Sequence, residues 1–540
     1  MKILFLARHY TYFRNFEGAI RDLAARGHRL HLAVDREDGQ AIVERLAREC
    51  PGLSFGLTPR PPQTADSRLA AALRLGLDYL RYADPVYDGT PAIRARASER
   101  TPRLAVLLAA RAGRVRAARW LGAVESQLAR PAAIDAFLEA QAPDLVLFTP
   151  LIELGSPQLD YLRAARARGL RTALAVWSWD HLSSKALIRV RPDAVLVWNE
   201  TQRREAIDMH GLPSDCVVVT GAQCFDQWFD RTPARDRAAF CRRAGLADAR
   251  PFVLYVCSAL FRGSPSEAEF VRRWIRRVRG SADPALRDVP ILVRPHPQRM
   301  AEWDGIDLAR EWHDVAVFGS SPIDPDSRND YFDSLHHSAA VVGLNTSALI
   351  EAAIVDRPVY TILLPEFHDN QEGTLHFRYL LNVGDSFLHR ARSFEDHVAE
   401  LAAGVAGRPA RRNDAFVRQF IRPEGPTVPA TPRFVAAIEA RLAAPAPRPV
   451  DEAAAARAWR PAAAALSRVM VTALGVRLLG DPRWAREMAD RAASEAGRRR
   501  RYEVEQRTRR DEQRRRRRTK AVAAVKTAIL RAGLAPRPRH

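Results

Sequence analysis

The sequence predicts an α/β protein built from two doubly wound, Rossmann-like domains that face a cleft. A strand, a helix and a second strand follow one another from residue 2 onward. The same alternation resumes at 144–220, and a separate series begins at 252. Strands that alternate with helices form parallel sheets covered on both faces. A chain of 540 residues is also too long for one hydrophobic core, so two large domains with additional segments are expected.

The composition excludes several classes of protein. Hydrophobic residues make up 47% of the chain and charged residues 27%, as in globular proteins. The five cysteines are scattered without a CxxC pair, which favours a reducing compartment and argues against structural zinc. The apolar start is too short for a signal peptide, and no uninterrupted apolar segment is long enough to span a bilayer. We therefore expect a cytoplasmic protein, with the inner face of the plasma membrane as an alternative location.

The first domain is assigned to residues 1–230. Its first strand, 2–7, is followed by a loop at 8–14, where open α/β sheets bind ligands, but this loop lacks the glycines of a dinucleotide fingerprint. A helical insertion with many arginines is expected at about 60–131. Those arginines either cover solvated helix faces or meet an anionic surface.

An unusual polar and aromatic segment follows the predicted strand at 172–177. Trp177, Trp179, Asp180, His181 and Lys185 gather in it. This segment is either a structural aromatic turn or a functional loop at a strand end.

The second domain is assigned to residues 231–405, and its most informative part is 338–377. A buried strand at 339–342, a small polar turn, a helix at 348–355 and a strand at 359–364 form a βαβ unit. The N-terminus of such a helix suits a diphosphate, to which Thr346 and Ser347 add hydroxyl donors, while Glu351 can accept from ribose hydroxyls. Alternatively, Thr346 or Ser347 merely caps the helix and Glu351 is solvated.

The chain then continues as a helical extension at 406–480 and a long, basic helical tail at 481–540. Residues 498–520 carry thirteen Lys or Arg and four acidic residues, which supply +9 of the total charge of +21. The tail either binds anionic lipid or is a solvated charged helix. Tyr502 is the single aromatic residue in 498–520, which argues against nucleic-acid binding by base stacking.

Four motifs carry a resemblance to a known fold family. They are VVVTGAQCFDQ at 217–227, LVRPHP at 292–297, YFDSL at 331–335 and GLNTSALIEAAIVDRPVYTI at 343–362. With the two-domain pattern, they resemble the GT-B fold of nucleotide-sugar glycosyltransferases. The resemblance is greatest to bacterial surface and capsular polysaccharide glycosyltransferases, CDP-glycerol glycerophosphotransferases and UDP-N-acetylglucosamine 2-epimerases, and it spans about residues 2–386.

The resemblance implies a donor site in the second domain. Arg294 and His296 would face the donor diphosphate, Thr346 and Ser347 would meet the same phosphates, and Glu351 would take the ribose hydroxyls. The other donor-site candidates are Ser320, Asn345, His368, Gln371 and His376. No metal or other cofactor is expected, because a helix dipole and cations can stabilise the leaving diphosphate.

The resemblance also implies a general base in the first domain, facing the cleft. His9, Asp180 and His181 qualify by position, and His9 and Asp180 are not separated by the sequence.

The expected activity is metal-independent transfer of a sugar from a nucleotide-diphosphate donor to a cell-envelope polysaccharide or lipid-linked acceptor. The alternatives are transfer of glycerol phosphate from CDP-glycerol, for which His296 would matter more, and epimerisation of a nucleotide sugar. A non-enzymatic protein that binds anionic membrane or nucleic acid through its basic tail is the alternative from a different class.

Overall fold

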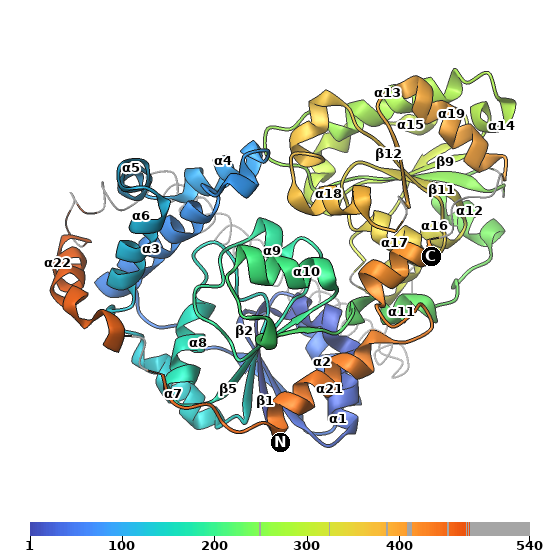
Figure 1. The fold of residues 1–540 in the computed structure, drawn as a ribbon. Coiled ribbons are helices and arrows are strands. Elements are labelled where there is room, and N and C mark those ends of the chain that lie inside the picture. Colours follow the sequence, from blue (N-terminus) through green and yellow to red (C-terminus); the bar gives the residue numbers. More distant parts are fainter. Residues whose placement is uncertain are drawn as a thin grey trace, which may run out of the picture.

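The computed structural model describes residues 1–247, 250–322, 324–384, 387–407, 413–450, 453–470, 472 and 475. Two parallel sheets organise these residues, and helices cover both faces of each sheet (Figure 1). The predicted fold class, two doubly wound Rossmann-like domains, is confirmed. The basic tail expected at 481–540 lies outside the described residues.

The first sheet has seven parallel strands in the order β3-β2-β1-β4-β5-β6-β7. The strands are β1 (Lys2–His9), β2 (Arg29–Arg36), β3 (Leu53–Leu57), β4 (Leu145–Phe148), β5 (Arg171–Ala175), β6 (Ala194–Val197) and β7 (Val217–Val219). Central strands such as β4, with the sequence LVLF, are entirely buried, because helices lie on both sides of a parallel sheet. The strand order reverses between β1 and β4, so a crevice opens at their carboxyl ends.

The helices of the first domain surround this sheet. They are α1 (Glu17–Ala25), α2 (Gln40–Glu49), α7 (Ala132–Gln141), α8 (Gln158–Ala167), α9 (His181–Ser184), α10 (Glu200–Arg204) and the π-helical turn η3 (Glu205–Met209). The segment after β1, expected as a loop, is the 3₁₀ helix η1 (Tyr10–Phe16). Its Phe13 and Phe16 rings both pack edge-on against Phe5, each at a centroid distance of 5.1 Å.

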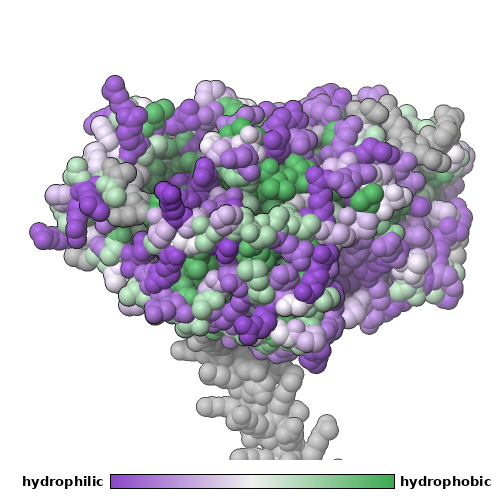
Figure 2. Space-filling view, turned by 60° about the horizontal axis from the view of Figure 1, so that its bottom comes forward, coloured by the Kyte–Doolittle hydropathy of each residue, from purple (hydrophilic) through white to green (hydrophobic). Residues whose placement is uncertain are grey.

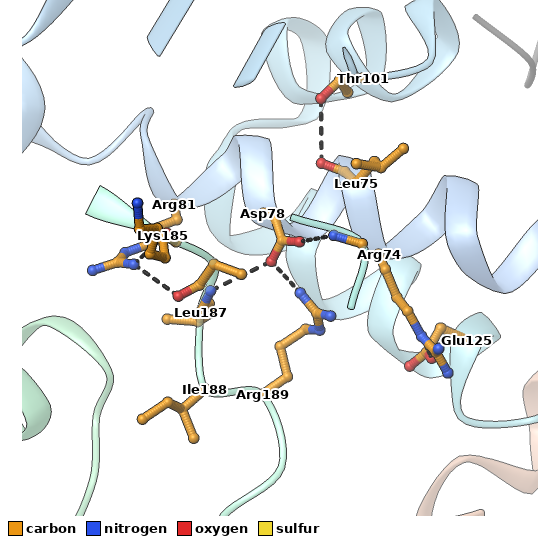
Figure 3. Close-up of polar contacts among 12 residues, drawn as sticks. Arg74, Leu75, Asp78, Arg81, Thr101, Glu125, Lys185, Leu187, Ile188 and Arg189 are labelled. Carbon is orange, nitrogen blue, oxygen red and sulfur yellow. Dashed lines mark hydrogen bonds and ion pairs between the residues drawn. The ribbon is translucent and has the colours of Figure 1, made fainter. Parts of the chain in front are cut away.

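Four helices form the region expected as a helical insertion: α3 (Ala65–Arg81), α4 (Pro91–Arg100), α5 (Arg103–Ala112) and α6 (Arg114–Glu125). Helix α3 is fixed to the first domain by buried charges. Asp78 is fully buried, accepts hydrogen bonds from Gly155 N at 2.9 Å and Leu187 N at 3.4 Å, and pairs with Arg189 (Figure 3). Because each of these groups has a partner, the buried charge is tolerated.

The second sheet has six parallel strands in the order β10-β9-β8-β11-β12-β13, so its topology repeats that of the first sheet. The strands are β8 (Phe252–Val256), β9 (Ile291–Arg294), β10 (Val315–Val317), β11 (Ser338–Gly343), β12 (Val359–Ile362) and β13 (Leu388–Ala391). The helices are α12 (Arg237–Ala244), α13 (Glu267–Arg279), α14 (Pro284–Arg287), α15 (Leu308–Glu311), α16 (Pro325–His336), α17 (Ala348–Ile354), α18 (Leu375–Asn382) and α19 (Phe394–Val405).

The end of the described chain returns from the second domain to the first. The elements at this end are α20 (Asp414–Phe416), η8 (Val417–Ile421), α21 (Ala430–Ala443), η9 (Ala454–Trp459) and α22 (Arg460–Met470). The short helix α11 (Asp226–Phe229) lies earlier, in the segment between the two sheets. Phe434 and Ile438 of α21 are buried in the core of the first domain. Asp226 fixes the crossing, because its carboxylate accepts from Arg422 Nε at 3.0 Å and Thr431 N at 2.6 Å. Helix α22 then packs on the insertion next to α3.

Candidate active site

A cavity of about 170 Å³ lies between the two domains. Its walls come from the carboxyl ends of strands in both sheets, which is where open α/β sheets bind ligands. The first domain contributes Arg14, Asn15, Trp177, Ser178, Trp179, Trp198, Cys224, Phe225, Gln227 and Trp228. The segment joining the domains and the second domain contribute Arg231, Pro322, Arg328, Tyr331, Ser347 and Glu351.

The wall from the first domain is mainly aromatic. Trp177 and Trp179 follow β5, and Trp198 follows β6. Trp198 is held in place because its indole Nε1 donates to Val176 O at 3.0 Å. Tryptophan faces in a cleft can pack against a sugar ring or a base, so this wall suits an organic ligand rather than a bare ion.

The wall from the second domain carries a connected polar set. Tyr331 donates a hydrogen bond to Glu351 Oε2, and the Arg294 guanidinium carbon lies 5.0 Å from the centre of the Tyr331 ring. Gly319 follows β10 and leaves the space that Arg294 fills, since a Cβ there would come within 2.4 Å of the guanidinium. The φ of Gly319 is +119°, which also favours glycine.

Positive charge predominates around this set. Arg14 and Arg294 both act on the carboxylate of Glu351, and Arg328 lines the same cavity. Burial lowers the pKa of Arg294 and of Arg14, and it raises the pKa of Glu351 against the opposing effects of Tyr331, Arg14 and Arg294. Among the described residues, the buried Arg294 Nη1 has no hydrogen-bond partner. A buried, unpaired donor with excess positive charge nearby favours an anionic ligand.

The two walls touch at the rim of the cavity. Arg328 Nη2 lies 3.3 Å from Glu17 Oε1, and Arg14 Nη1 donates to Pro322 O at 3.4 Å. Both contacts join an element of the first domain to the 319–330 region of the second. The cavity is therefore assembled only when the two domains are in contact.

The start of α17 lies on the same cavity. Ser347 is the N-cap residue, is exposed and makes no side-chain capping bond, whereas the hydroxyl of Thr346 accepts from Ala348 N at 3.4 Å. Glu351 lies one turn further along, and its backbone N–H bonds to Ser347 O at 3.1 Å. This spacing puts a serine hydroxyl and a carboxylate on one side of the helix, both in the cavity lining.

A second interdomain contact involves Asn345 and His376. The His376 ring packs edge-on against Trp179 at a centroid distance of 4.7 Å, and Asn345 Nδ2 lies 3.4 Å from His376 Nε2. Burial lowers the pKa of His376 to about 4, so its imidazole is neutral at neutral pH. Its Nδ1 is buried without a hydrogen-bond partner among the described residues.

Asp180 lies close to this contact, and its carboxylate already has three partners. Its carboxylate accepts from Ser178 Oγ at 2.5 Å and Ser184 Oγ at 2.9 Å, and it pairs with Lys185 Nζ at 3.1 Å. Burial alone would raise the pKa of Asp180, but Lys185 and His376 hold that pKa well below its usual range. A carboxylate stabilised in this way is a weak proton acceptor.

His9 and His181, the two other candidates for the general base, differ in how far they are buried. His9 ends β1 and is half-buried; its Nδ1 is bonded to Thr11 Oγ1, and burial lowers its pKa. Its ring lies 4.5 Å from Tyr12, whose ring lies 5.0 Å from Trp177 of the cavity wall. His181 is fully buried, and burial lowers its pKa to about 3. The structure therefore does not bring His181 to the cleft surface.

Of the ten donor-site candidates, Ser347 and Glu351 line the cavity. Besides Arg294, Asn345, Thr346 and His376, four more lie outside its lining. His296 caps η6 (Pro297–Trp303), its Nδ1 accepting from Gln298 N at 3.2 Å, and Ser320 is exposed, with its carbonyl accepting from Arg294. His368 lines a separate cavity of about 570 Å³ within the second domain. Gln371 is 1% exposed, and its Nε2 donates to Ile362 O at 3.0 Å and Thr361 Oγ1 at 3.1 Å, which ties its loop to β12.

Several residues of the cavity wall were not among the sequence candidates. Arg14, Trp228, Arg328 and Tyr331 are the main ones. Arg14 lies in the strand-end loop and Tyr331 opens the YFDSL motif, so both carried a signal, whereas Trp228 and Arg328 come from helices that only the tertiary fold brings to the cleft.

Comparisons with known proteins are limited to structure. No protein-family model matches the sequence, and no curated protein matches it either. Solved structures that resemble the chain include a UDP-GlcNAc 2-epimerase from Neisseria meningitidis bound to UDP-GlcNAc. The two sequences are 10% identical, the TM-score is 0.48, and the match covers 82% of this chain and 100% of the other. A glycosyltransferase from Rickettsia africae ESF-5 has 10% identity, a TM-score of 0.47 and coverage of 82% and 99%. WaaG, a glycosyltransferase involved in lipopolysaccharide biosynthesis, has 12% identity, a TM-score of 0.43 and coverage of 81% and 99%.

The described residues were considered for membrane-spanning helices and for metal-binding groups. None of their helices is both long and apolar enough to cross a membrane. Within the same part of the chain, no group of three His, Cys, Asp or Glu side chains is placed to hold a metal ion.

Proposed function

We propose that this protein is a GT-B enzyme that binds a nucleotide-diphosphate sugar between its domains and transfers the sugar to a cell-envelope polysaccharide or lipid-linked acceptor. One observation carries the proposal. Arg14 of the first domain and Ser347 and Glu351 of the second line one interdomain cavity, and Arg294 adjoins it through the ring of Tyr331. This set combines cations and a hydroxyl for a diphosphate with a carboxylate for a ribose, beside a wall of tryptophans.

Two polar parts of the donor, its ribose and its diphosphate, contact the protein in this proposal. The ribose hydroxyls donate to Glu351, which Tyr331 orients through its hydrogen bond. The diphosphate accepts from Arg294, whose Nη1 is unpaired among the described residues, and from the Ser347 hydroxyl. As the sugar leaves, negative charge grows on the diphosphate, and fixed cations in a partly dry cleft stabilise that charge. No metal ion is needed for this role.

The acceptor must lose a proton as it attacks. Its oxygen forms a bond to the anomeric carbon, the bond from that carbon to the diphosphate oxygen breaks, and the nucleoside diphosphate leaves. We assign the proton to His9, because its neutral imidazole can accept one, whereas Lys185 and the hydroxyls of Ser178 and Ser184 already stabilise the Asp180 carboxylate. Tyr12 lies between His9 and Trp177 of the cavity wall, which supports an acceptor position on the side of β1.

A thermal-shift screen tests the proposal. The full-length protein is heated with UDP-, GDP-, CMP-, CDP- and dTDP-linked sugars and with CDP-glycerol. One sugar donor should raise the melting temperature in proportion to its occupancy. The bound donor is then incubated without acceptor, where an epimerase would change the sugar and a transferase would not. Stabilisation by CDP-glycerol alone, epimerised product, or no stabilisation by any donor would each contradict the proposal.

A further inference from the structure

The outer surface of the helical insertion has an unusual composition. The face of the molecule in Figure 2 is mainly hydrophilic, and its hydrophobic residues gather largely in recesses. Against this background, twelve large hydrophobic side chains are notably exposed among the described residues, and five of them lie on α5 and α6 of the insertion and on η9 and α22, which pack on it. They are Leu107 of α5, Val115 and Trp120 of α6, Trp459 of η9 and Val469 of α22.

Helix α6 separates a buried side from an exposed side. Ala117, Leu121 and Val124 are buried against α3 and α5. Val115, Arg116, Arg119 and Trp120 are exposed, and their spacing puts them together on the opposite side of the helix. Val115 is 64% exposed and Trp120 is 40% exposed. Within the described part of the chain, this side of α6 therefore remains largely exposed.

Helix α5 extends the same kind of surface. Leu107 is 54% exposed, and Arg111, one turn later, is exposed as well. We call the six side chains Leu107, Arg111, Val115, Arg116, Arg119 and Trp120 the α5–α6 face.

The arginines of the α5–α6 face make no contribution to the fold through ion pairs. Arg114, on a different side of α6, pairs with Asp84, and the buried Arg74 pairs with Glu125 at 2.8 Å. Arg111, Arg116 and Arg119 have no acidic partner within the described residues. Three unpaired positive charges beside exposed Leu, Val and Trp side chains are thus available to a partner.

We propose that the α5–α6 face binds the surface of a bilayer that contains anionic phospholipids. Guanidinium groups pair with lipid phosphates, while Trp, Val and Leu enter the boundary between headgroups and acyl chains. Nucleic acid would use the charge of this face but not Leu107 or Val115, so the combination favours lipid. In Figure 1, α5, α6 and α22 lie together at the end of the molecule away from the second domain, so a membrane there leaves the interdomain cavity uncovered.

Vesicle binding by the full-length protein tests this proposal. The Arg116→Gln/Arg119→Gln variant is compared with the matched Arg242→Gln/Arg276→Gln variant, which loses the same charge from exposed positions on α12 and α13. Each arginine near an anionic surface contributes about a fivefold change in affinity, so we expect the first variant to bind phosphatidylglycerol vesicles roughly tenfold or more weakly than the control. Neither protein should bind vesicles of phosphatidylcholine alone, and binding should weaken with salt.

Hydrogen exchange on the same vesicles separates this face from the basic tail. If the α5–α6 face is bound, amides in 103–125 become protected when anionic vesicles are added, and the protection is smaller in Arg116→Gln/Arg119→Gln. Vesicle binding without protection of 103–125, or equal weakening in both variants, would overturn the proposal. So would protection of this face that grows with protein concentration in the absence of vesicles, because that result would assign the face to a second copy of the chain.

Discussion

Arg328 of α16 and Glu17 of α1 join the two domains at the rim of the cavity, with 3.3 Å between Nη2 and Oε1. Glu17 is buried and also pairs with Arg45 at 2.6 Å and Arg21 at 3.2 Å. One carboxylate is therefore shared by three guanidinium groups, which leaves Arg328 only partly compensated. Arg328 thus contacts both domains and is also a cation of the cavity wall.

The first prediction concerns Arg328→Gln. Loss of this cation should raise the Kd for the nucleoside diphosphate about tenfold, since a charge-assisted contact contributes about 1.5–3 kcal/mol. The melting temperature without ligand should change little, because Glu17 keeps its other two partners. Calorimetry measures the affinity, and Arg310→Gln, at a highly exposed position on α15, serves as the control. Equal affinities in the two variants would remove Arg328 from the site.

Glu351→Gln should remove the preference for ribose. If Glu351 accepts from both ribose hydroxyls, the wild-type protein binds a ribonucleoside diphosphate more tightly than its 2′-deoxy form, and the variant binds both with similar, weaker affinity. Each lost charge-assisted bond should cost about tenfold in Kd. A competition assay with the two nucleotides measures the ratio. An unchanged ratio in Glu351→Gln would place the ribose elsewhere.

His9→Asn should impair the chemical step but not donor binding. We expect kcat to fall about 100-fold or more, as for the loss of a general base, with the Kd for the donor unchanged. Burial puts the His9 pKa below 6.5, so the wild-type rate should hold at pH 7 and fall as the pH drops through a value under 6.5. His9→Asn should lack that decline. A larger loss of kcat in Asp180→Asn at unchanged melting temperature would assign the base to Asp180 instead.

The charges that fix the insertion should control stability. Glu125 is 1% exposed and lies between Arg74 and Arg163; these arginines overcome the effect of burial and lower its pKa to about 2. Its contribution is therefore present above about pH 4.5 and is lost as the pH falls toward 2. Glu125→Gln should destabilise the protein by about 3 kcal/mol at pH 7, because the guanidinium groups of the buried Arg74 and of Arg163 lose the carboxylate charge that they share.

Melting curves at pH 7 and at lower pH check this expectation. The difference between wild type and Glu125→Gln should shrink as the pH falls below 4.5. Glu139→Gln, at an exposed position on α7, should melt like the wild type at every pH. A difference between Glu125→Gln and wild type that stays constant with pH would show that the Glu125 charge is not the cause.

The two sheets could be largely predicted because their central strands are continuous apolar runs. Strand β11, with the sequence SAAVVG, is one example, and it was predicted as part of the βαβ unit. Two edge strands, β3 and β13, were not predicted. Their sequences, LSFGL and LHRA, contain polar or small residues, because an edge strand is only partly covered. Their positions are set by pairing with β2 and β12, which no local pattern reveals.

The site was predictable where a residue ends a strand or starts a helix. Glu351 and Ser347 lie in the cavity lining because the turn after β11 fixes the direction of α17. The segment from the end of β12 to the start of α18 was harder to interpret, because its polar side chains point in different directions. Gln371 bonds to its own sheet, His368 faces a separate cavity and His376 meets Trp179. Side-chain direction in an irregular loop depends on tertiary contacts that the sequence does not specify.

The most direct test of the account is calorimetry of Arg294→Gln with the nucleoside diphosphate of the best donor. Arg294 is 6% exposed and borders the cavity through Tyr331, so its guanidinium should be a principal contact of the diphosphate. We expect the Kd to rise at least tenfold relative to the wild type and to the Arg310→Gln control, while the variant keeps a cooperative melting transition. Unchanged affinity in a folded Arg294→Gln protein would contradict the claim that this interdomain cavity holds the donor.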